Sequence, residues 1–376
     1  MKKQMKKFLT ILLAGLMTVS TASIFTACKP SDDTQAKNVI LLIGDGMGPE
    51  QIKAGELFKG EALTMQGFPY MTKVETRSAS DAVTDSAAAA TAIATGTRTA
   101  NGMIGLDIED NQLETIVDIA HSLGKRTGII ATEELNGATP MGFSAHADNR
   151  GQALALIESA AESSNVDLFA GSVLNTSYLR LFREFGYEKI TNADDISEST
   201  ADKIIGSYII PATYEAMTTK GAYVAFDRLV TEALEFLSKD EDGFFLMAEG
   251  SHIDHGGHNK DFCYMLEELI AFDNMVGAVL EWAKDRDDTV VIVTADHETG
   301  GLMLANDITH EDVVAAYDAN GDSSCYSWTV EGHTSVDVNL YVNGANIDFS
   351  KYSFGTKDRI KNTDIFEIMK GLMLGQ

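Results

Sequence analysis

Positive charge is scarce in this chain. Its 29 Lys and Arg face 56 Asp and Glu, so the formal net charge is −27 at pH 7. A surface this acidic repels nucleic acid and anionic lipid, and we expect the chain to bind neither by charge. An anionic substrate would therefore need a local positive centre on this protein.

Cysteine is also rare. The chain has only Cys28, Cys263 and Cys325, which are too few for a disulfide framework. Cys263 and Cys325 could pair in an oxidising compartment, and otherwise we expect them to be structural or free thiols.

The first 27 residues have the pattern of an export signal. Four lysines precede the apolar run Phe8–Val19, which is too short to span a bilayer comfortably. Small residues just before Cys28 resemble a lipoprotein cleavage box, although Phe25 stands where leucine is usual. We predict a membrane-anchored lipoprotein, exposed at the cell surface or in the periplasm, with residues 28–37 as a flexible tether. Cleavage would remove four lysines and no acids, which changes the net charge to −31. The alternative is an ordinary cleaved signal with a chance cysteine.

Residues 38–376 contain no long linker, repeat or low-complexity segment, which favours one large α/β domain. Short apolar runs alternate with helical patterns, as in βαβ units with a parallel sheet. The expected strands are Val39–Ile43, Thr127–Ala131, Phe244–Met247 and Thr289–Val293. The expected helices are Gln112–Leu123, Gly151–Ser163, Ala225–Leu237, Asp261–Lys284 and Asp364–Leu374. Asn165–Met217 is more polar and less periodic, so we expect an irregular insertion or cap there.

The chemistry centres on Ser86, which is followed by four alanines and then by Gly96. This pattern predicts a helix that begins at or near the serine. Ser86 could be an N-cap, whose hydroxyl accepts a hydrogen bond from a backbone N–H. It could instead be a nucleophile at the positive end of the helix dipole. Because a serine hydroxyl is nearly inert at neutral pH, the second interpretation requires a base or a metal.

Residues that could coordinate a metal follow three of the expected strands. In parallel α/β sheets, substrates and cofactors bind at these carboxyl ends of the strands. Asp45 lies between glycines and could be a metal ligand or part of an ordinary turn. Asp254 and His258 are four residues apart, share one face of a helical turn and suit zinc. Asp296 and His297 would point opposite ways inside a strand, but at its end both can turn into one site.

Three further residues are ambiguous when each is taken alone. Thr139 offers a hydroxyl oxygen that magnesium could accept as a ligand. Arg150 has the planar fork that matches phosphate oxygens, but it equally fits a solvated surface. His333 is isolated in a loop, where most histidines are ordinary polar residues.

Taken together, these motifs resemble those of bacterial alkaline phosphatases, in the same order from about Asn38 to the C-terminus. The segments that carry the resemblance are Gly44–Gly48, Thr84–Ala88, Ala138–Pro140 followed by Arg150, Glu249–Asp254, Thr294–His297 and Gly332–Thr334. The resemblance implies a three-layer α/β sandwich with a mostly parallel central sheet. It also implies hydrolysis of phosphate monoesters through a phosphoserine, at a site with two zinc ions and one magnesium ion.

The resemblance assigns a role to each motif residue. Ser86 would be the nucleophile, and Arg150 would bind the phosphate. The implied ligands of the first zinc ion are Asp254, His258 and His333, and those of the second are Asp45, Asp296, His297 and Ser86 Oγ. Asp45 would also bridge to a magnesium ion held by Thr139 and Glu249.

Three departures from the family pattern matter. Gly137 stands where the family usually has an acid or a histidine near the magnesium, so we expect a weaker, more hydrated third site that needs added magnesium. His255 stands where some members have lysine and others histidine. Asn165–Met217 is short for the family, which leaves an accessory crown and a homodimer open.

Three other functions are compared with this one: a sulfatase, a phosphodiesterase and a binding protein. A sulfatase needs an arginine in the box after its modified serine or cysteine, and the alanines after Ser86 lack one. Phosphodiesterases of the same superfamily generally use threonine as the nucleophile and lack the ligands Thr139 and Glu249. A lipid-anchored protein that only binds phosphate or metal would be favoured if a catalytic ligand were missing, and none is missing.

Overall fold

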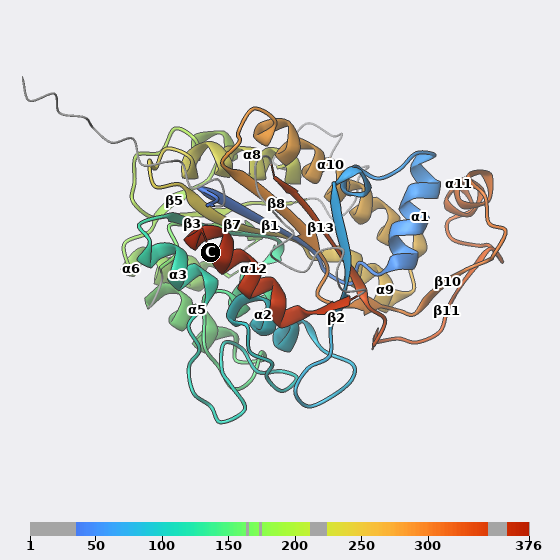
Figure 1. Cartoon of the computed structure of the whole chain (residues 1–376), viewed down its shortest axis with the longest axis horizontal. Coiled ribbons are helices and arrows are strands. Elements are labelled where there is room, and N and C mark those ends of the chain that lie inside the picture. The colour runs from blue at the N-terminus through green and yellow to red at the C-terminus, as the bar shows by residue number, and fades with distance from the viewer. Residues whose placement is uncertain (1–34, 163–164, 173–174, 211–223, 345–358, 376) are drawn as a thin grey trace, which may run out of the picture. The chain divides into compact units, whose positions relative to one another are not determined.

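One sheet of ten strands runs through the computed structural model of the chain (Figure 1). The structure describes residues 35–162, 165–172, 175–210, 224–344 and 359–375. In spatial order the strands are β14 (Arg359–Lys361), β2 (Tyr70–Glu75), β13 (Val338–Gly344), β8 (Thr289–Thr294), β1 (Asn38–Gly44), β7 (Phe244–Gly250), β3 (Arg126–Glu134), β4 (Leu168–Ser172), β6 (Ile204–Ser207) and β5 (Glu188–Ile190). Among these strands only β13 runs antiparallel to its neighbours, β8 and β2.

Two groups of helices cover the two faces of the sheet (Figure 1). One group consists of α1 (Pro49–Lys59), α8 (Phe226–Leu237), α9 (His252–Asn259), α10 (Phe262–Ala283) and α11 (His310–Asp318). The other consists of α2 (Ser86–Thr95), α3 (Ile116–Ser122), α4 (Ala138–Gly142), α5 (Ala153–Glu162), α6 (Thr176–Glu184) and α12 (Asn362–Leu374). The three-layer arrangement with a mostly parallel sheet is confirmed.

Short elements complete the described fold. Two small antiparallel sheets pair β10 (Leu302–Leu304) with β11 (Tyr326–Trp328), and β12 (His333–Thr334) with β9 (Glu298–Thr299). The 3₁₀ helices are η1 (Thr64–Gly67) and η2 (Ala193–Asp195). The β12–β9 pair brings His333 opposite Thr299, next to the end of β8.

The registers of the central strands explain where the polar motifs meet. All residues of β1, β7 and β8 are buried, as expected for apolar strands covered by helices on both faces. Gly44 of β1 lies opposite Gly250 of β7, and Ile43 lies opposite Thr294 of β8. The three strands therefore end together, and the segments that follow them converge at one edge of the sheet.

All four predicted strands and all five predicted helices are present, with different ends. The largest difference is in α3, which begins at Ile116 and not at Gln112. Thr115 caps this helix, because its hydroxyl accepts from the Asp118 N–H while the Asp118 carboxylate accepts from the Thr115 N–H. This reciprocal capping box fixes the helix start. Residue 163, the predicted end of the second helix, lies outside the described residues.

The prediction of an irregular segment over Asn165–Met217 is wrong for its described part. These residues form β4, α6, β5, η2 and β6, and the three strands extend the sheet at one edge. Their strands have only three to five residues. So few residues give too little alternation for a sequence pattern to be recognised. Residues 211–217 lie outside the described part of the chain.

The cysteines and the N-terminal segment complete the comparison with the sequence. Cys263 and Cys325 are half-buried free thiols, which agrees with the expectation of structural or free cysteines. The predicted signal peptide, Cys28 and the tether as far as residue 34 lie outside the described residues. The tether prediction is wrong for its last residues, because Ala36 is buried and its N–H donates to the Leu372 carbonyl at 2.8 Å. Within the described ranges, no helix has the length and apolar character needed to cross a membrane.

Candidate active site

The site lies beyond the carboxyl ends of β1, β7 and β8, where Gly46 allows the loop after β1 to touch helix α9. Gly46 has φ +75°, a left-handed conformation that favours glycine. A Cβ atom there would lie 2.6 Å from the Cα of Asp254. The backbone N–H of Gly46 also donates to Asp296 Oδ1 at 3.2 Å. A glycine at this position therefore joins the three segments that carry Asp45, Asp254 and Asp296.

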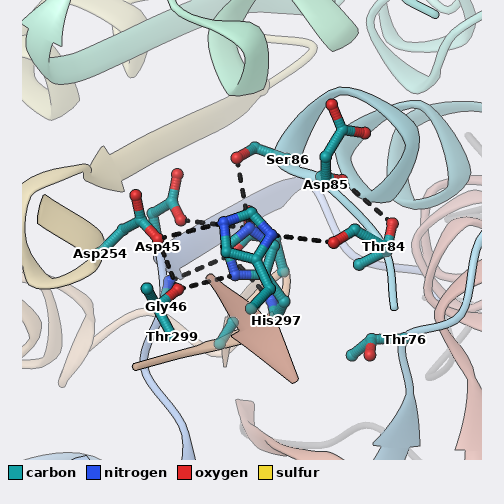
Figure 2. A network of polar contacts seen from close by, with 12 residues as sticks. Asp45, Gly46, Thr76, Thr84, Asp85, Ser86, Asp254, His297 and Thr299 are labelled. Atoms are coloured by element: carbon teal, nitrogen blue, oxygen red, sulfur yellow. Dashed lines mark hydrogen bonds and ion pairs between the residues drawn. The ribbon is translucent and has the colours of Figure 1, made fainter. Parts of the chain in front are cut away.

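Ser86 faces this edge from the start of α2 (Figure 2). The N-cap of α2 is Asp85, whose Oδ1 accepts from the Ala88 N–H at 3.0 Å. The interpretation of Ser86 as the N-cap is therefore wrong, since Ser86 is the first helical residue. Its side chain is buried, and Oγ lies 3.2 Å from His297 Nε2.

Asp45, Asp296 and His297 form the first cluster of candidate metal ligands. One donor atom from each lies within 4.8 Å of the others. His297 Nε2 is 3.1 Å from Asp296 Oδ2 and 3.6 Å from Asp45 Oδ1. Burial raises the pKa of both carboxyl groups, and the charge of Asp296 raises that of Asp45 further. Burial also lowers the pKa of His297 well below its usual value. A neutral imidazole does not balance these acids, so the cluster suits a cation.

Thr299 orients the His297 ring (Figure 2). The Thr299 hydroxyl donates its proton to Asp254 Oδ1. Its oxygen lies 3.2 Å from His297 Nδ1 and can only accept there, so Nδ1 carries the imidazole proton. The lone pair of His297 Nε2 is consequently directed at Ser86 and the carboxylates, as a metal-binding histidine requires.

Asp254, His258 and His333 form the second cluster. His258 Nδ1 donates to the Glu331 carbonyl at 2.7 Å, and His333 Nδ1 donates to the Thr84 carbonyl at 2.9 Å. In their neutral forms both rings therefore present Nε2 lone pairs, which face each other at 3.2 Å. Asp254 oxygens lie 3.3 and 3.5 Å from these two nitrogens.

With both rings neutral, three lone-pair donors converge at the second cluster, which is unfavourable unless a cation binds. Two imidazole nitrogens and one carboxylate oxygen are ligands that suit zinc. The His333 ring also stacks on the His297 ring, with 3.5 Å between their centroids. The two clusters are therefore adjacent.

A third group of donors is buried without partners. Glu249 in β7 is fully buried, and neither of its carboxylate oxygens has a hydrogen-bond partner among the described residues. The same holds for Thr139 Oγ1 and Asp45 Oδ1. Burial, and next the charge of Glu133, raise the pKa of Glu249 well above its usual value. Unpaired buried oxygens of this kind fit a hard cation such as magnesium.

Arg150 is held beside the nucleophile candidate. Its Nη1 donates to Asp85 Oδ2 at 3.2 Å, and its backbone N–H donates to the Gly102 carbonyl at 2.7 Å. The side chain is 41% exposed, so the guanidinium, held on the residue next to Ser86, keeps donors for a ligand. Asp85 thus has two tasks, because it caps α2 and orients Arg150.

The comparisons with known proteins identify the family. The profile of the alkaline phosphatase family matches residues 36–178 and 179–326. The chain belongs to the alkaline phosphatase family. It is 30% identical over 335 residues to alkaline phosphatase 3 of Bacillus subtilis, which covers 82% of this chain and 72% of that protein. It is 31% identical over 342 residues to alkaline phosphatase of Escherichia coli, with 73% of each protein covered.

The fold is similar to that of solved alkaline phosphatases. The structure of the enzyme from the Antarctic bacterium TAB5 gives a TM-score of 0.78 at 30% identity, and covers 91% of this chain and 98% of that one. The cold-active enzyme of a Shewanella species also gives 0.78, at 27% identity, with 89% and 99% covered. The resemblance to this family is confirmed, and with it a metal-dependent enzyme that hydrolyses phosphoesters.

The sequence did not reveal several residues that orient the site of this alkaline phosphatase. Asp85 had a detectable signal, since an acid three residues before a helical N–H is a typical N-cap. Thr299 lies two residues after His297, but its position between His297 and Asp254 depends on the fold. The carbonyl groups of Thr84 and Glu331 leave no trace in a sequence, because every residue has one.

Proposed function

We propose that this alkaline phosphatase hydrolyses phosphate monoesters through a phosphoserine formed on Ser86. One observation carries the proposal. Ser86 Oγ lies at the start of α2, 3.2 Å from a His297 nitrogen whose lone pair Thr299 directs into the site. A serine at this point has the metal-binding surroundings that could activate it without a histidine base.

Each cluster fits one of the ions that the family implies. Asp254, His258 and His333 would hold one zinc ion, and Asp45, Asp296 and His297 would hold another. Thr139, Glu249 and Asp45 would hold magnesium. When bound, such ions lower the pKa of a ligated hydroxyl and stabilise the attacking and leaving oxygens of an in-line displacement. In support, variants of the TAB5 enzyme with one histidine replaced by aspartate or glutamate hold magnesium at the site named M3.

The residues of the chain perform the remaining steps. Ser86 Oγ gives up its proton and attacks phosphorus, and the bond between phosphorus and the ester oxygen breaks. The alcohol leaves after taking up a proton, and the phosphoryl group is then attached to serine. Arg150 and the N–H groups at the start of α2 bind the equatorial oxygens, where charge gathers during phosphoryl transfer. Water then attacks the phosphorus of the phosphoserine and the bond to Oγ breaks, which releases inorganic phosphate and regenerates the Ser86 hydroxyl.

Three esters of one leaving group test this function. We expect the metal-loaded enzyme to hydrolyse a nitrophenyl phosphate monoester far faster than the matching diester or sulfate ester. Metal analysis of the same sample should give two zinc ions and one magnesium ion per chain. Faster hydrolysis of the diester would indicate a phosphodiesterase, and faster hydrolysis of the sulfate ester would indicate a sulfatase. Bound metal without turnover of any ester would favour a binding protein.

We also propose that Cys28 anchors the protein to a membrane. Changing Cys28→Ser should release the protein from the membrane fraction or block its maturation, because the lipid-bearing thiol is lost. Fractionation and N-terminal analysis of the mature protein measure this. The matched control, Cys263→Ser, removes a packed thiol and should leave the protein in the membrane fraction. A wild-type protein found outside that fraction, with an N-terminus other than Cys28, would contradict the lipoprotein hypothesis.

A further inference from the structure

The room beside Gly137 is occupied by another carboxylate. Gly137 has φ −56°, which other residues adopt readily, so the backbone does not require glycine. A Cβ atom at this position would lie 2.3 Å from Glu133 Oε1 and 3.1 Å from the Glu134 carbonyl oxygen. The missing side chain at 137 therefore leaves the space in which the Glu133 carboxylate lies.

Glu133 lies beside the turn that leads to the third group of donors. Its Oε1 is 2.3 Å from the place that a Cβ of residue 137 would take, and its negative charge also contributes to the raised pKa of both Glu249 and Asp45. Two residues after Gly137, Thr139 presents its unpartnered hydroxyl. Glu249 and Thr139 are 0% and 1% exposed, so their three unpaired oxygens are not simply solvated.

A cavity of about 330 Å³ lies beside this carboxylate, with Glu133, Gly137, His252 and His255 among its lining residues. The side chain of Glu133 is 25% exposed. Water in the cavity can therefore reach the Glu133 carboxylate. This suits magnesium, which prefers six ligands and usually keeps several of its waters.

We propose that Glu133 anchors the hydrated side of a magnesium ion held by Thr139, Glu249 and Asp45. The carboxylate acts from the end of β3, in the space that Gly137 leaves. This inference rests on the proposed function only for the identity of the ion site. It replaces the expectation of a weak third site, which assumed that no acid compensates for the glycine.

The competing role for Glu133 is a simple ion pair. Its Oε2 lies 3.4 Å from His255 Nε2, and that contact raises the pKa of the histidine. If the pair were its only role, loss of Glu133 would change His255 and leave magnesium binding unaltered. Magnesium affinity measured without substrate therefore separates the two roles.

The experiment measures magnesium binding to the zinc-loaded full chain by calorimetry and equilibrium dialysis. Changing Glu133→Ala should weaken binding about 10- to 100-fold, the usual cost of losing a group that supports metal ligands. Glu134→Ala removes the same charge one residue away and should change the affinity little. Glu133→Ala combined with Gly137→Asp returns a carboxylate to the vacated space and should restore the affinity to within a few-fold of wild type. Gly137→Asp alone should not bind magnesium more tightly than wild type, because its side chain collides with Glu133.

The outcomes distinguish this inference from the proposed function. Wild-type affinity in Glu133→Ala would overturn the inference and assign the carboxylate to His255 alone. So would equal weakening in Glu133→Ala and Glu134→Ala, which would reveal a general charge effect. Because no substrate is present, either result leaves monoester hydrolysis to be judged separately. Conversely, a wild type without monoesterase activity that still binds one magnesium through Glu133 would refute the function and support the inference.

Discussion

Changing Ser86→Ala should lower kcat on a phosphate monoester by about 10⁴- to 10⁶-fold, the range expected when a nucleophile is lost. The substitution should change little in the rest of the structure. Asp85 caps α2 and holds Arg150, so neither the helix start nor the position of Arg150 depends on the Ser86 hydroxyl. Alanine is also a strong helix former at this position. We therefore expect near-native stability and nearly unchanged zinc content.

Acid-quenched labelling gives the decisive measurement for this variant. Wild-type enzyme mixed with a radiolabelled monoester should yield phosphoserine at residue 86, and the variant should yield none. Ser122→Ala is a suitable control, since its hydroxyl bonds the Ile119 carbonyl at the end of α3. Label on another residue, or a variant that retains most of its activity, would exclude Ser86 as the nucleophile.

The central part of the fold could be predicted because its signals are local. β1, β7 and β8 are fully buried apolar runs, and each ends directly before a polar motif. Parallel strands align their carboxyl ends, so the position of the site follows from the pattern. The edge formed by β4, β5 and β6 could not be predicted in this way. Its strands are too short to show a period, and pairing with the rest of the sheet stabilises them.

The candidate site could be predicted as a set of residues but not as a geometry. The sequence indicates which acids and histidines follow the strands, and the structure brings Asp45, Asp254 and Asp296 together through Gly46. The direction of each imidazole lone pair depends on acceptors such as the Thr84 carbonyl, which a sequence does not distinguish. The same limit applies to Gly137. Its departure from the family pattern is visible in the sequence, but its compensation by Glu133 requires the coordinates.

Removing the metals should destabilise the protein strongly and abolish its activity. Asp45, Asp296 and Glu249 are buried, and no lysine or arginine forms an ion pair with any of them in the described ranges. An uncompensated buried charge costs about 3–5 kcal/mol, and each 1 kcal/mol shifts the Tm of a large domain by about 2–4 °C. We therefore expect chelation to lower the Tm by about 10 °C or more at pH 8.

The pH dependence identifies the cause of that loss. Burial raises the pKa of these three carboxyl groups in the metal-free fold. Above the unfolded pKa of about 4, the metal-free native state binds more protons than the unfolded state, so its stability falls as the pH rises. The lowered pKa of the buried His297 acts in the opposite direction only below the unfolded histidine pKa of about 6.5. The Tm difference between loaded and chelated protein should therefore grow from pH 7 to pH 8.5. Scanning calorimetry with and without a chelator measures it, and added zinc and magnesium should restore the loaded Tm.

Asp45→Asn is the informative variant for this experiment. The substitution removes the buried carboxylate that would contribute to both a zinc site and the magnesium site. Without metals, the variant should therefore be more stable than the wild type at pH 8. The loaded variant should be less stable than the loaded wild type, because a ligand is lost. This reversal of order is expected only if cations neutralise the buried carboxylates. Equal Tm values for loaded and chelated wild type across the pH range would contradict that role for the metals.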